Sequence, residues 1–330
     1  MINAFYSLVA VVLLVVAATI GAAGPAGKTL FGIVLPYAAL VVFAAGIVYR
    51  VVKWARSPVP FRITTTCGQQ KSLPWIKYSW LENPATTGGV LGRMALEILF
   101  FRSLFRSSKV GWRDQRLVYG DNQLLWLGAL AFHYSFLVIL LRHLRFFTEP
   151  VAPFVPLLQN LDGFFQIGVP ELYLTDLVIL AALGYLFLRR VLSPALRYIS
   201  QPADYFALFL LLAIASSGVL MRYFTKVDVR TVKELAMGLV SFQPVLPEGI
   251  GIVFYVHLFL VSALLVYFPF SKLVHLAGVF LSPTRNLANN NRRFRHLNPW
   301  NSPVKVHTYE EWEDDFREKM RAAKLPLEKE

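Results

Sequence analysis

The chain has 330 residues, of which 56% are hydrophobic and 16% are charged, and its formal net charge is +13. Soluble domains carry about 25% charged residues. Here the apolar residues form long blocks, so the composition argues against an ordinary soluble enzyme and predicts a membrane protein. The basic residues fall mostly between these blocks, where cytoplasmic retention of loops explains them, and we therefore predict no nucleic-acid partner.

Six segments are long and apolar enough to cross a lipid bilayer, because a helix needs about 20 residues to span a hydrocarbon core of about 30 Å. The predicted spans are Ala4–Ala23, Leu30–Val52, Gln123–Leu144, Leu172–Leu192, Tyr205–Tyr223 and Ile250–Leu281. The predicted fold is therefore all-α, a polytopic bundle of six transmembrane helices. The first segment has no Lys or Arg before it, unlike a signal peptide, and we expect it to be retained. The last is longer than needed and should tilt, kink or project beyond the bilayer.

Loop charge sets the predicted orientation. The stretch Arg50–Asp121 holds twelve Lys and Arg against four acidic residues, whereas Arg145–Glu171 holds one Arg and three acidic residues. Cytoplasmic loops are the ones enriched in Lys and Arg. The charge pattern thus predicts a multi-pass protein of the cytoplasmic membrane with both termini in the cytoplasm.

This topology divides the chain into an N-terminal transmembrane helix (1–29), a membrane domain (30–285) with a basic cytoplasmic loop (53–121), and a polar cytoplasmic tail (286–330). Within the loop, Gly92–Arg106 predicts an amphipathic helix on the membrane surface or, equally, a docking surface for a soluble subunit. Within the tail, Tyr309–Ala323 predicts a charged surface helix.

The chain contains a single cysteine, Cys67. That count excludes a cysteine-ligated iron–sulfur cluster, a thiolate zinc site, a CxxCH haem attachment and an internal disulfide, and we interpret Cys67 as structural. A redox cofactor needs other ligands, and the six histidines are the candidates.

Four of the six histidines fall inside predicted spans, where an ionisable side chain is costly and usually functional. They are His133 and His143 on the third span, and His257 and His275 on the sixth. Any one of them alone reads equally well as a hydrogen-bonded packing residue. Two histidines on each of two helices instead indicate haem ligation, because haem sites in bundles are built from side chains on facing helices.

The third and sixth predicted spans are antiparallel, so His143 lies level with His257 at the outer side and His133 lies level with His275 nearer the cytoplasm. His257 and His275 are separated by five helical turns, roughly 27 Å. His133 and His143 are separated by roughly 15 Å along the axis and about 80° around it. Because the two separations differ, we expect helix tilt or a kink near Pro269 to bring the pairs together.

An iron held by two histidines has no open coordination position, which suits electron transfer rather than oxygen chemistry. Haem propionates need cationic or hydrogen-bonding partners, and Arg142 and Arg222 are the candidates we favour. Snorkelling or interfacial anchoring accounts for any single arginine or lysine near these levels. The other cations near the two levels are Arg145, Arg189, Arg190, Arg197 and Lys272.

The paired histidine spacings of ten and eighteen resemble those of the nitrate reductase gamma subunit family. Members are five-helix cytochromes b that bind two haems through four histidines on two helices. The resemblance covers roughly Leu30–Leu281 and leaves one extra N-terminal helix. It implies two haem b groups, one held by His143 and His257 and the other by His133 and His275.

The basic loop with TTTCGQQKSLPWIK (Thr64–Lys77) and the tail HLNPWNSPVKVHTYEEWEDDFREKM (His296–Met320) resemble a branch of this family, the DsrM-type cytochrome b subunits of DsrMKJOP complexes. That resemblance implies a menaquinone partner in the membrane, a cytoplasmic DsrK-like iron–sulfur subunit, further DsrMKJOP-like subunits and a role in dissimilatory sulfur metabolism.

These observations predict the quinone-reactive subunit of an oxidoreductase complex that exchanges electrons between menaquinone and the iron–sulfur subunit. The resembled family binds quinone beside the outer haem, and candidates here are Arg142, Asp162 and Glu171, since quinol oxidation needs a proton acceptor. Related alternatives are a nitrate reductase gamma-type or heterodisulfide reductase-type subunit. Two alternatives of other classes are a proton-coupled transporter, although we see no internal repeat of the kind transporters show, and a haem-free membrane anchor for a soluble enzyme.

Overall fold

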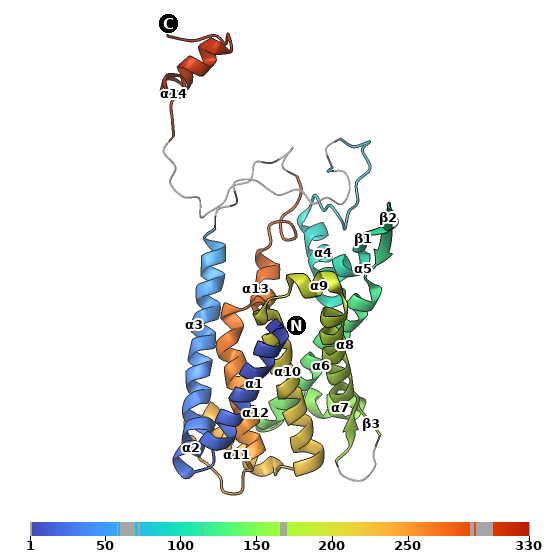
Figure 1. Cartoon of the computed structure of the whole chain (residues 1–330), viewed down its shortest axis with the longest axis vertical. Coiled ribbons are helices and arrows are strands. Elements are labelled where there is room, and N and C mark those ends of the chain that lie inside the picture. Colours follow the sequence, from blue (N-terminus) through green and yellow to red (C-terminus); the bar gives the residue numbers. More distant parts are fainter. Residues whose placement is uncertain are drawn as a thin grey trace.

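The structure of the chain is a computed structural model that describes residues 2–57, 59, 70–71, 73–113, 115–165, 170–290, 294 and 306–329. Its long helices lie side by side in one bundle (Figure 1). Cys67 and the part of the tail that holds His296 lie outside the described residues.

Five helical stretches in the described chain are long and apolar enough to cross a membrane. They are α1 (Ile2–Gly21); Pro25–Ala55, which comprises α2 (Pro25–Thr29), a π-helical turn and α3 (Leu35–Ala55); Gln123–Phe146, which begins with α6 (Gln123–His143); Pro202–Thr225, which begins with α10 (Pro202–Val219); and Ile252–Phe270, which begins with α12 (Ile252–Tyr267). The predicted all-α membrane bundle is confirmed for these five.

The sixth predicted span, Leu172–Leu192, corresponds to α8 (Leu174–Leu192), which packs against α6 and α10. It is 19 residues long, but it carries Asp176 in its first turn and Arg189 and Arg190 in its last. Because of these charges α8 is not among the helices that qualify as spans by composition.

The bundle is organised around α10, which packs against α1, α8 and α12. Leu210 of α10 and Leu260 of α12 are fully buried in the main apolar cluster, together with Tyr255. By contrast, Leu13 of α1 and Val41 of α3 are 62% and 67% exposed. A helix bundle in a membrane faces lipid with such side chains, so the exposed apolar surface fits the hydrocarbon core rather than water.

The last predicted span, Ile250–Leu281, is not one continuous helix. After α12 a single 3₁₀ turn contains Pro269, and Ser271 then adopts an extended conformation with φ −114° and ψ 179°. The chain restarts as a 3₁₀ turn (Lys272–Val274) and the four-residue helix α13 (His275–Gly278). Proline cannot donate the backbone hydrogen bond that a continuing helix needs, which explains the break.

One end of the bundle carries α4 (Thr87–Phe100), α5 (Arg102–Arg106), the hairpin β1–β2 (Ser108–Arg113 and Arg116–Asp121), α9 (Pro194–Ile199) and α13 (Figure 1). We call it the α4 end. The predicted helix Gly92–Arg106 is wrong as a single element, because Phe101 adopts a left-handed conformation (φ 49°) between α4 and α5. This conformation is uncommon for a bulky residue and turns the chain sharply.

The opposite end, the α11 end, carries α2, α7 (Phe154–Asp162), the short pair β3–β4 (Gly163–Phe165 and Leu172–Tyr173) and α11 (Val229–Val240) (Figure 1). Beyond the bundle, the tail forms α14 (Tyr309–Ala322), close to the predicted bounds. A capping box between Thr308 and Glu311 starts α14, because each side chain accepts a hydrogen bond from the other residue's backbone N–H.

Candidate functional site

His133 and His275 lie together near the α4 end. Their ring centroids are 6.0 Å apart and their planes cross at 86°. Two metal–nitrogen bonds of about 2 Å, plus about 1 Å from each nitrogen to its ring centre, separate two axial imidazole centroids by roughly 6 Å. The observed spacing therefore fits two imidazoles on opposite sides of one iron. Phe101 packs edge-on against His133, with 4.9 Å between ring centroids.

The helix break after Pro269 is what makes this pairing geometrically available. A straight helix would carry His275 roughly 27 Å from His257, whereas His133 and His143 are separated by only about 15 Å on α6. Since regular helical geometry ends at Ser271, this straight-helix distance does not apply, and the His275 ring lies 6.0 Å from that of His133.

Each of the four histidines has its Nδ1 atom tied to a local oxygen. His133 Nδ1 lies 2.8 Å from the Ala129 carbonyl, His143 Nδ1 lies 2.7 Å from the Ile139 carbonyl, and His275 Nδ1 lies 3.0 Å from the Lys272 carbonyl. A carbonyl oxygen only accepts, so Nδ1 carries the proton in each case and Nε2 keeps its lone pair. Metal-binding histidines are oriented in this way.

His257 reaches the same state through a side chain of α10. Its Nδ1 atom lies 2.9 Å from Ser217 Oγ, and the Ser217 hydroxyl itself donates to the Ile214 carbonyl. Because the hydroxyl proton of Ser217 is donated to Ile214, Ser217 Oγ acts as the acceptor of the hydrogen bond from His257 Nδ1. A Cβ atom on the next residue, Gly218, would come within 3.5 Å of the imidazole ring. That is an ordinary van der Waals distance, so the His257 ring packs close to the α10 backbone at Gly218.

His143 and His257 lie at the α11 end, since His143 is the last residue of α6 and His257 is in the second turn of α12. The four histidines thus lie at two depths: His133 and His275 near the α4 end, with their rings 6.0 Å apart, and His143 and His257 at the α11 end of α6 and α12.

A buried polar cluster lies directly beside His143, and we call it the arginine–tyrosine cluster. Its cation Arg142 is 7% exposed and forms ion pairs with Asp162 (3.0 Å) and Asp176 (2.8 Å). The Tyr173 ring lies between two guanidinium groups, 3.8 Å from that of Arg142 and 3.9 Å from that of Arg222.

The same cluster is cross-linked by neutral donors. Thr175 donates to Asp162 from its backbone N–H (2.8 Å) and its hydroxyl (2.6 Å), and Tyr223 donates its hydroxyl proton to Asp176 (2.8 Å). The hydroxyl of Tyr223 also accepts from the backbone N–H of Tyr173 (3.1 Å). Two arginines and two aspartates balance in charge, which is the condition under which buried ions are tolerated.

Three nitrogen atoms of the cluster stay buried without a hydrogen bond in the described structure: Arg142 Nε, Arg142 Nη1 and Arg222 Nε. Arg142 Nη1 lies close to Asp162 but outside hydrogen-bond geometry. An unsatisfied buried donor is expensive, so each normally has a ligand or water as its partner. These three nitrogen atoms are therefore the donors of the cluster that remain available to an acceptor such as a water molecule or a ligand oxygen.

The other residues that the sequence suggested as cofactor or quinone contacts lie at both ends of the bundle. Arg222 donates to the backbone carbonyl of Glu171 (2.9 Å), while the Glu171 carboxylate packs against Gly163 of the β3–β4 pair. At the α4 end, Arg190 and Lys272 both lie beside Asp204 at the start of α10. Arg190 and Lys272 are thus paired with a carboxylate, whereas Arg222 bonds a backbone carbonyl and keeps its Nε atom without a partner in the described structure.

Sequence reasoning missed several residues that the structure brings to these sites. Asp176 had a usable signal, because an acid inside an apolar stretch is usually functional. Ser217, Tyr173 and Tyr223 had none, since serine and tyrosine are unremarkable in membrane helices. Phe101 was hidden by its position within an apparently continuous amphipathic stretch.

The donor set fits haem. Both pairs offer neutral imidazole nitrogens on facing segments of a bundle, as haem sites in helix bundles require, and no group of three or more metal-ligating side chains is found in the described residues. Two histidines and no third ligand fit an iron whose other four positions belong to a porphyrin. The pairs are accordingly candidate bis-histidine haem sites.

Comparison with known proteins agrees with this architecture. The nitrate reductase gamma subunit family model matches residues 91–295, a stretch that contains all four histidines. The chain is 48% identical over 278 residues to an Hdr-like menaquinol oxidoreductase cytochrome b-like subunit of Archaeoglobus fulgidus, covering 82% of this chain and 83% of the relative. A protein of the same description from Archaeoglobus profundus is 43% identical over 277 residues, 81% of each chain.

Replacing Arg142 by leucine should destabilise the protein strongly, because it leaves two buried carboxylates facing one another without a cation. Breaking a buried ion pair in this way costs about 3–5 kcal/mol. Thermal unfolding in detergent, followed by circular dichroism, measures the effect. The matched variant Arg145→Leu removes an arginine that forms no ion pair in the described structure, and it should change stability by less than about 1 kcal/mol. Equal effects of the two variants would contradict the structural role assigned to the cluster.

Proposed function

This chain belongs to the nitrate reductase gamma subunit family, and we propose that it is the di-haem cytochrome b subunit of a menaquinol oxidoreductase complex. The observation that carries the proposal is the approach of His133 and His275 to a ring separation of 6.0 Å, with both Nδ1 atoms already donating to carbonyls. The similarity to two Hdr-like menaquinol oxidoreductase subunits supports the substrate.

In this proposal α8 is the sixth transmembrane helix. Asp176 in its first turn is paired with Arg142, and Arg189 and Arg190 in its last turn are long enough to reach the interface. The α4 end faces the cytoplasm, because the basic stretch Arg50–Asp121 joins the helices there. Both termini then lie in the cytoplasm.

His143 and His257 hold the outer haem and His133 and His275 hold the inner one. Haem ligated by two imidazoles supplies one-electron transfer without an open coordination position. The two histidine pairs place the redox groups at different depths, which makes a path between the outer and inner faces. Phe101 packs edge-on against His133 and covers one side of that ring.

Menaquinol binds beside the outer pair, at the arginine–tyrosine cluster. Oxidising one menaquinol releases two electrons and two protons, so the site needs a proton acceptor as well as an electron acceptor. All four carboxylate oxygens of Asp162 and Asp176 accept hydrogen bonds, but the Asp176 side chain is 13% exposed against 5% for Asp162, and one of its donors is the Tyr223 hydroxyl, which can pass on a proton. Asp176 is therefore the better proton acceptor, and a donor on Arg142 or Arg222 orients the quinol oxygen.

The electrons leave at the α4 end to a cytoplasmic iron–sulfur subunit. The tail resembles that of DsrM-type subunits, which supports a DsrK-like partner in a DsrMKJOP-like complex and a role in dissimilatory sulfur metabolism. The tail helix α14 offers a surface for such a partner, because Tyr309, Trp312 and Phe316 are 47%, 43% and 37% exposed. Aromatic side chains in contact along one helix face are enriched at protein interfaces.

A reduced-minus-oxidised absorption spectrum of the purified protein should show b-type haem, with two haems per chain by pyridine haemochrome assay. His133→Ala and His275→Ala should each remove the same haem, and His143→Ala and His257→Ala the other, because each haem loses one of its two ligands. His307→Ala, in the exposed start of the tail, should keep both. A wild-type protein without haem, or different haems lost within one pair, would refute the assignment.

Asp176→Asn should slow menaquinol oxidation at least about tenfold while dithionite still reduces both haems, because amide nitrogen does not accept the quinol proton. The variant keeps the shape of the side chain and its contact with Tyr223. Asp228→Asn, at the N-terminus of α11, is the matched control and should leave the rate unchanged. An unaltered rate in Asp176→Asn would assign the proton to another group.

The protein isolated from its own membranes through an affinity tag on the N-terminus should co-purify with an iron–sulfur protein, identified by mass spectrometry and by its electron paramagnetic resonance signal. Removing residues 306–330 should lower the yield of that partner several-fold and leave the haem content intact, since α14 is separate from both histidine pairs. Full recovery of the partner without the tail would exclude α14 as its binding surface.

A further inference from the structure

The placement of His275 depends on a short turn rather than on a long helix. The turn follows the break after Pro269, and α13 has only four residues. An isolated helix of that length is unstable, because nucleating one turn costs more than its hydrogen bonds return. Other contacts must therefore fix the turn for His275 to remain opposite His133.

Local hydrogen bonds account for part of that support. The Ser271 hydroxyl donates to the Phe268 carbonyl (3.0 Å) and accepts from the Leu273 backbone N–H (3.2 Å). The carbonyl of Lys272 accepts from His275 Nδ1 (3.0 Å), so the imidazole is oriented by the residue three positions earlier in the same turn. These bonds shape the turn, but they do not attach it to the rest of the bundle.

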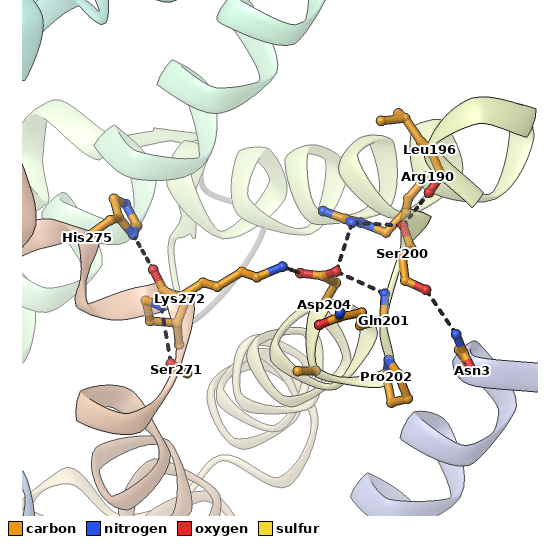
Figure 2. Close-up of polar contacts among 12 residues, drawn as sticks. Asn3, Arg190, Leu196, Ser200, Gln201, Pro202, Asp204, Ser271, Lys272 and His275 are labelled. Atoms are coloured by element: carbon orange, nitrogen blue, oxygen red, sulfur yellow. Dashed lines mark hydrogen bonds and ion pairs between the residues drawn. The ribbon is translucent and has the colours of Figure 1, made fainter. Parts of the chain in front are cut away.

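Val274, which is 4% exposed, anchors the turn by apolar burial, and the side chain of Lys272 adds a polar attachment, because its Nζ atom lies 2.8 Å from Asp204 Oδ1 at the start of α10. Figure 2 shows Lys272 extended between His275, at its backbone, and Asp204, at its ammonium group. Lys272 thus accepts a hydrogen bond from His275 with its carbonyl group and forms an ion pair with α10 through its side chain.

Asp204 is itself held rigidly. Its carboxylate is 10% exposed and accepts from the Gln201 backbone N–H (3.0 Å), which caps the first turn of α10. Arg190 of α8 approaches the second carboxylate oxygen to 3.7 Å. The anion is therefore fixed between α8 and α10, and the ion pair with Lys272 extends this fixed point to the turn after α12 (Figure 2).

We propose that the Asp204–Lys272 ion pair is a clamp that positions His275 opposite His133. Asp204 and Lys272 are positioning residues, because neither side chain would bind the iron. Both act on His275 through the Lys272 carbonyl, which accepts a hydrogen bond from His275 Nδ1. The inference rests on the proposed haem function for its redox consequence. Its structural part, the ordering of residues 271–275, stands on the contacts alone.

The clamp also sets the charge around the inner pair. Asp204 lies between the cations of Lys272 and Arg190, so removing its charge leaves two unbalanced cations. Positive charge favours a reduced redox group, whereas removing Lys272 takes one cation away. Loss of either partner should therefore loosen the turn equally, but shift the inner midpoint potential in opposite directions.

The test uses the full-length protein with Asp204→Asn, Lys272→Met and the conservative Lys272→Arg. Native-state hydrogen exchange should accelerate about tenfold or more at the backbone amides of residues 271–274 in the first two variants and remain slow in Lys272→Arg. Redox titration should raise the inner midpoint potential in Asp204→Asn, lower it in Lys272→Met, and leave the outer one unchanged. Asp228→Asn caps α11 at the other end and should alter neither readout.

Exchange and potentials like those of the wild type in both Asp204→Asn and Lys272→Met would overturn the proposal. Exchange that accelerates while both potentials move in the same direction would overturn its electrostatic part and keep the positioning role. If the wild type lacks haem but exchange in residues 271–274 still depends on the pair, the haem function fails and the positioning of His275 stands. If both haems are present and exchange is unaffected, the clamp fails alone.

Discussion

The constraint on which this structure depends is that a polar group inside a membrane bundle must find its partner within the protein. Water does not reach such groups in the hydrocarbon core, and each unsatisfied donor or acceptor is costly. The buried serines obey it by donating to a carbonyl one turn earlier, as Ser135 and Ser262 do. The four histidines obey it at Nδ1, and the same hydrogen bond that satisfies Nδ1 leaves Nε2 free to bind a metal. The hydrogen bond at Nδ1 therefore both satisfies a buried donor and orients the imidazole as a ligand.

The sequence carried the five long spans and the residues of both pairs, because hydropathy over 20 residues and ionisable residues within spans are strong signals. The sequence also raised a geometric problem. The two histidines are ten residues apart on one predicted helix and eighteen apart on the other, so two straight helices would not bring both pairs together. The resolution lies at Pro269 and Ser271, where helical geometry ends. A proline in a helical stretch predicts a kink or a break, but the proline alone does not determine which. The residues that follow it make tertiary contacts, such as the burial of Val274 and the ion pair of Lys272 with Asp204, that the local sequence does not encode.

The arginine–tyrosine cluster was harder to predict, and for a definite reason. Arg142 and Asp162 were recognisable singly, but their relationship depends on α7, the β3–β4 pair and α8 meeting at the α11 end. Tyr173 sits between two guanidinium groups because β4 runs directly into α8 and past both arginines. Such contacts join residues on different elements of the fold, and no periodicity within one segment encodes them. The same applies to α8, whose three charged residues keep it from qualifying as a span by composition although it packs against α6 and α10.

The two ends of the bundle are built differently, and the difference matches the chemistry proposed for each. At the α11 end, Arg142 and Asp162 are buried and balanced, and Asp176 is reached through a tyrosine hydroxyl, an arrangement suited to receiving protons away from bulk water. At the α4 end, Lys272 is 74% exposed and holds a four-residue helix, while Phe101 covers the opposite ring from a strained turn. The proposed electron transfer at the α4 end needs no proton, so a short and exposed helix that a partner subunit can approach is compatible with that function. On the proposed function, proton chemistry and partner contact lie at opposite ends of the bundle.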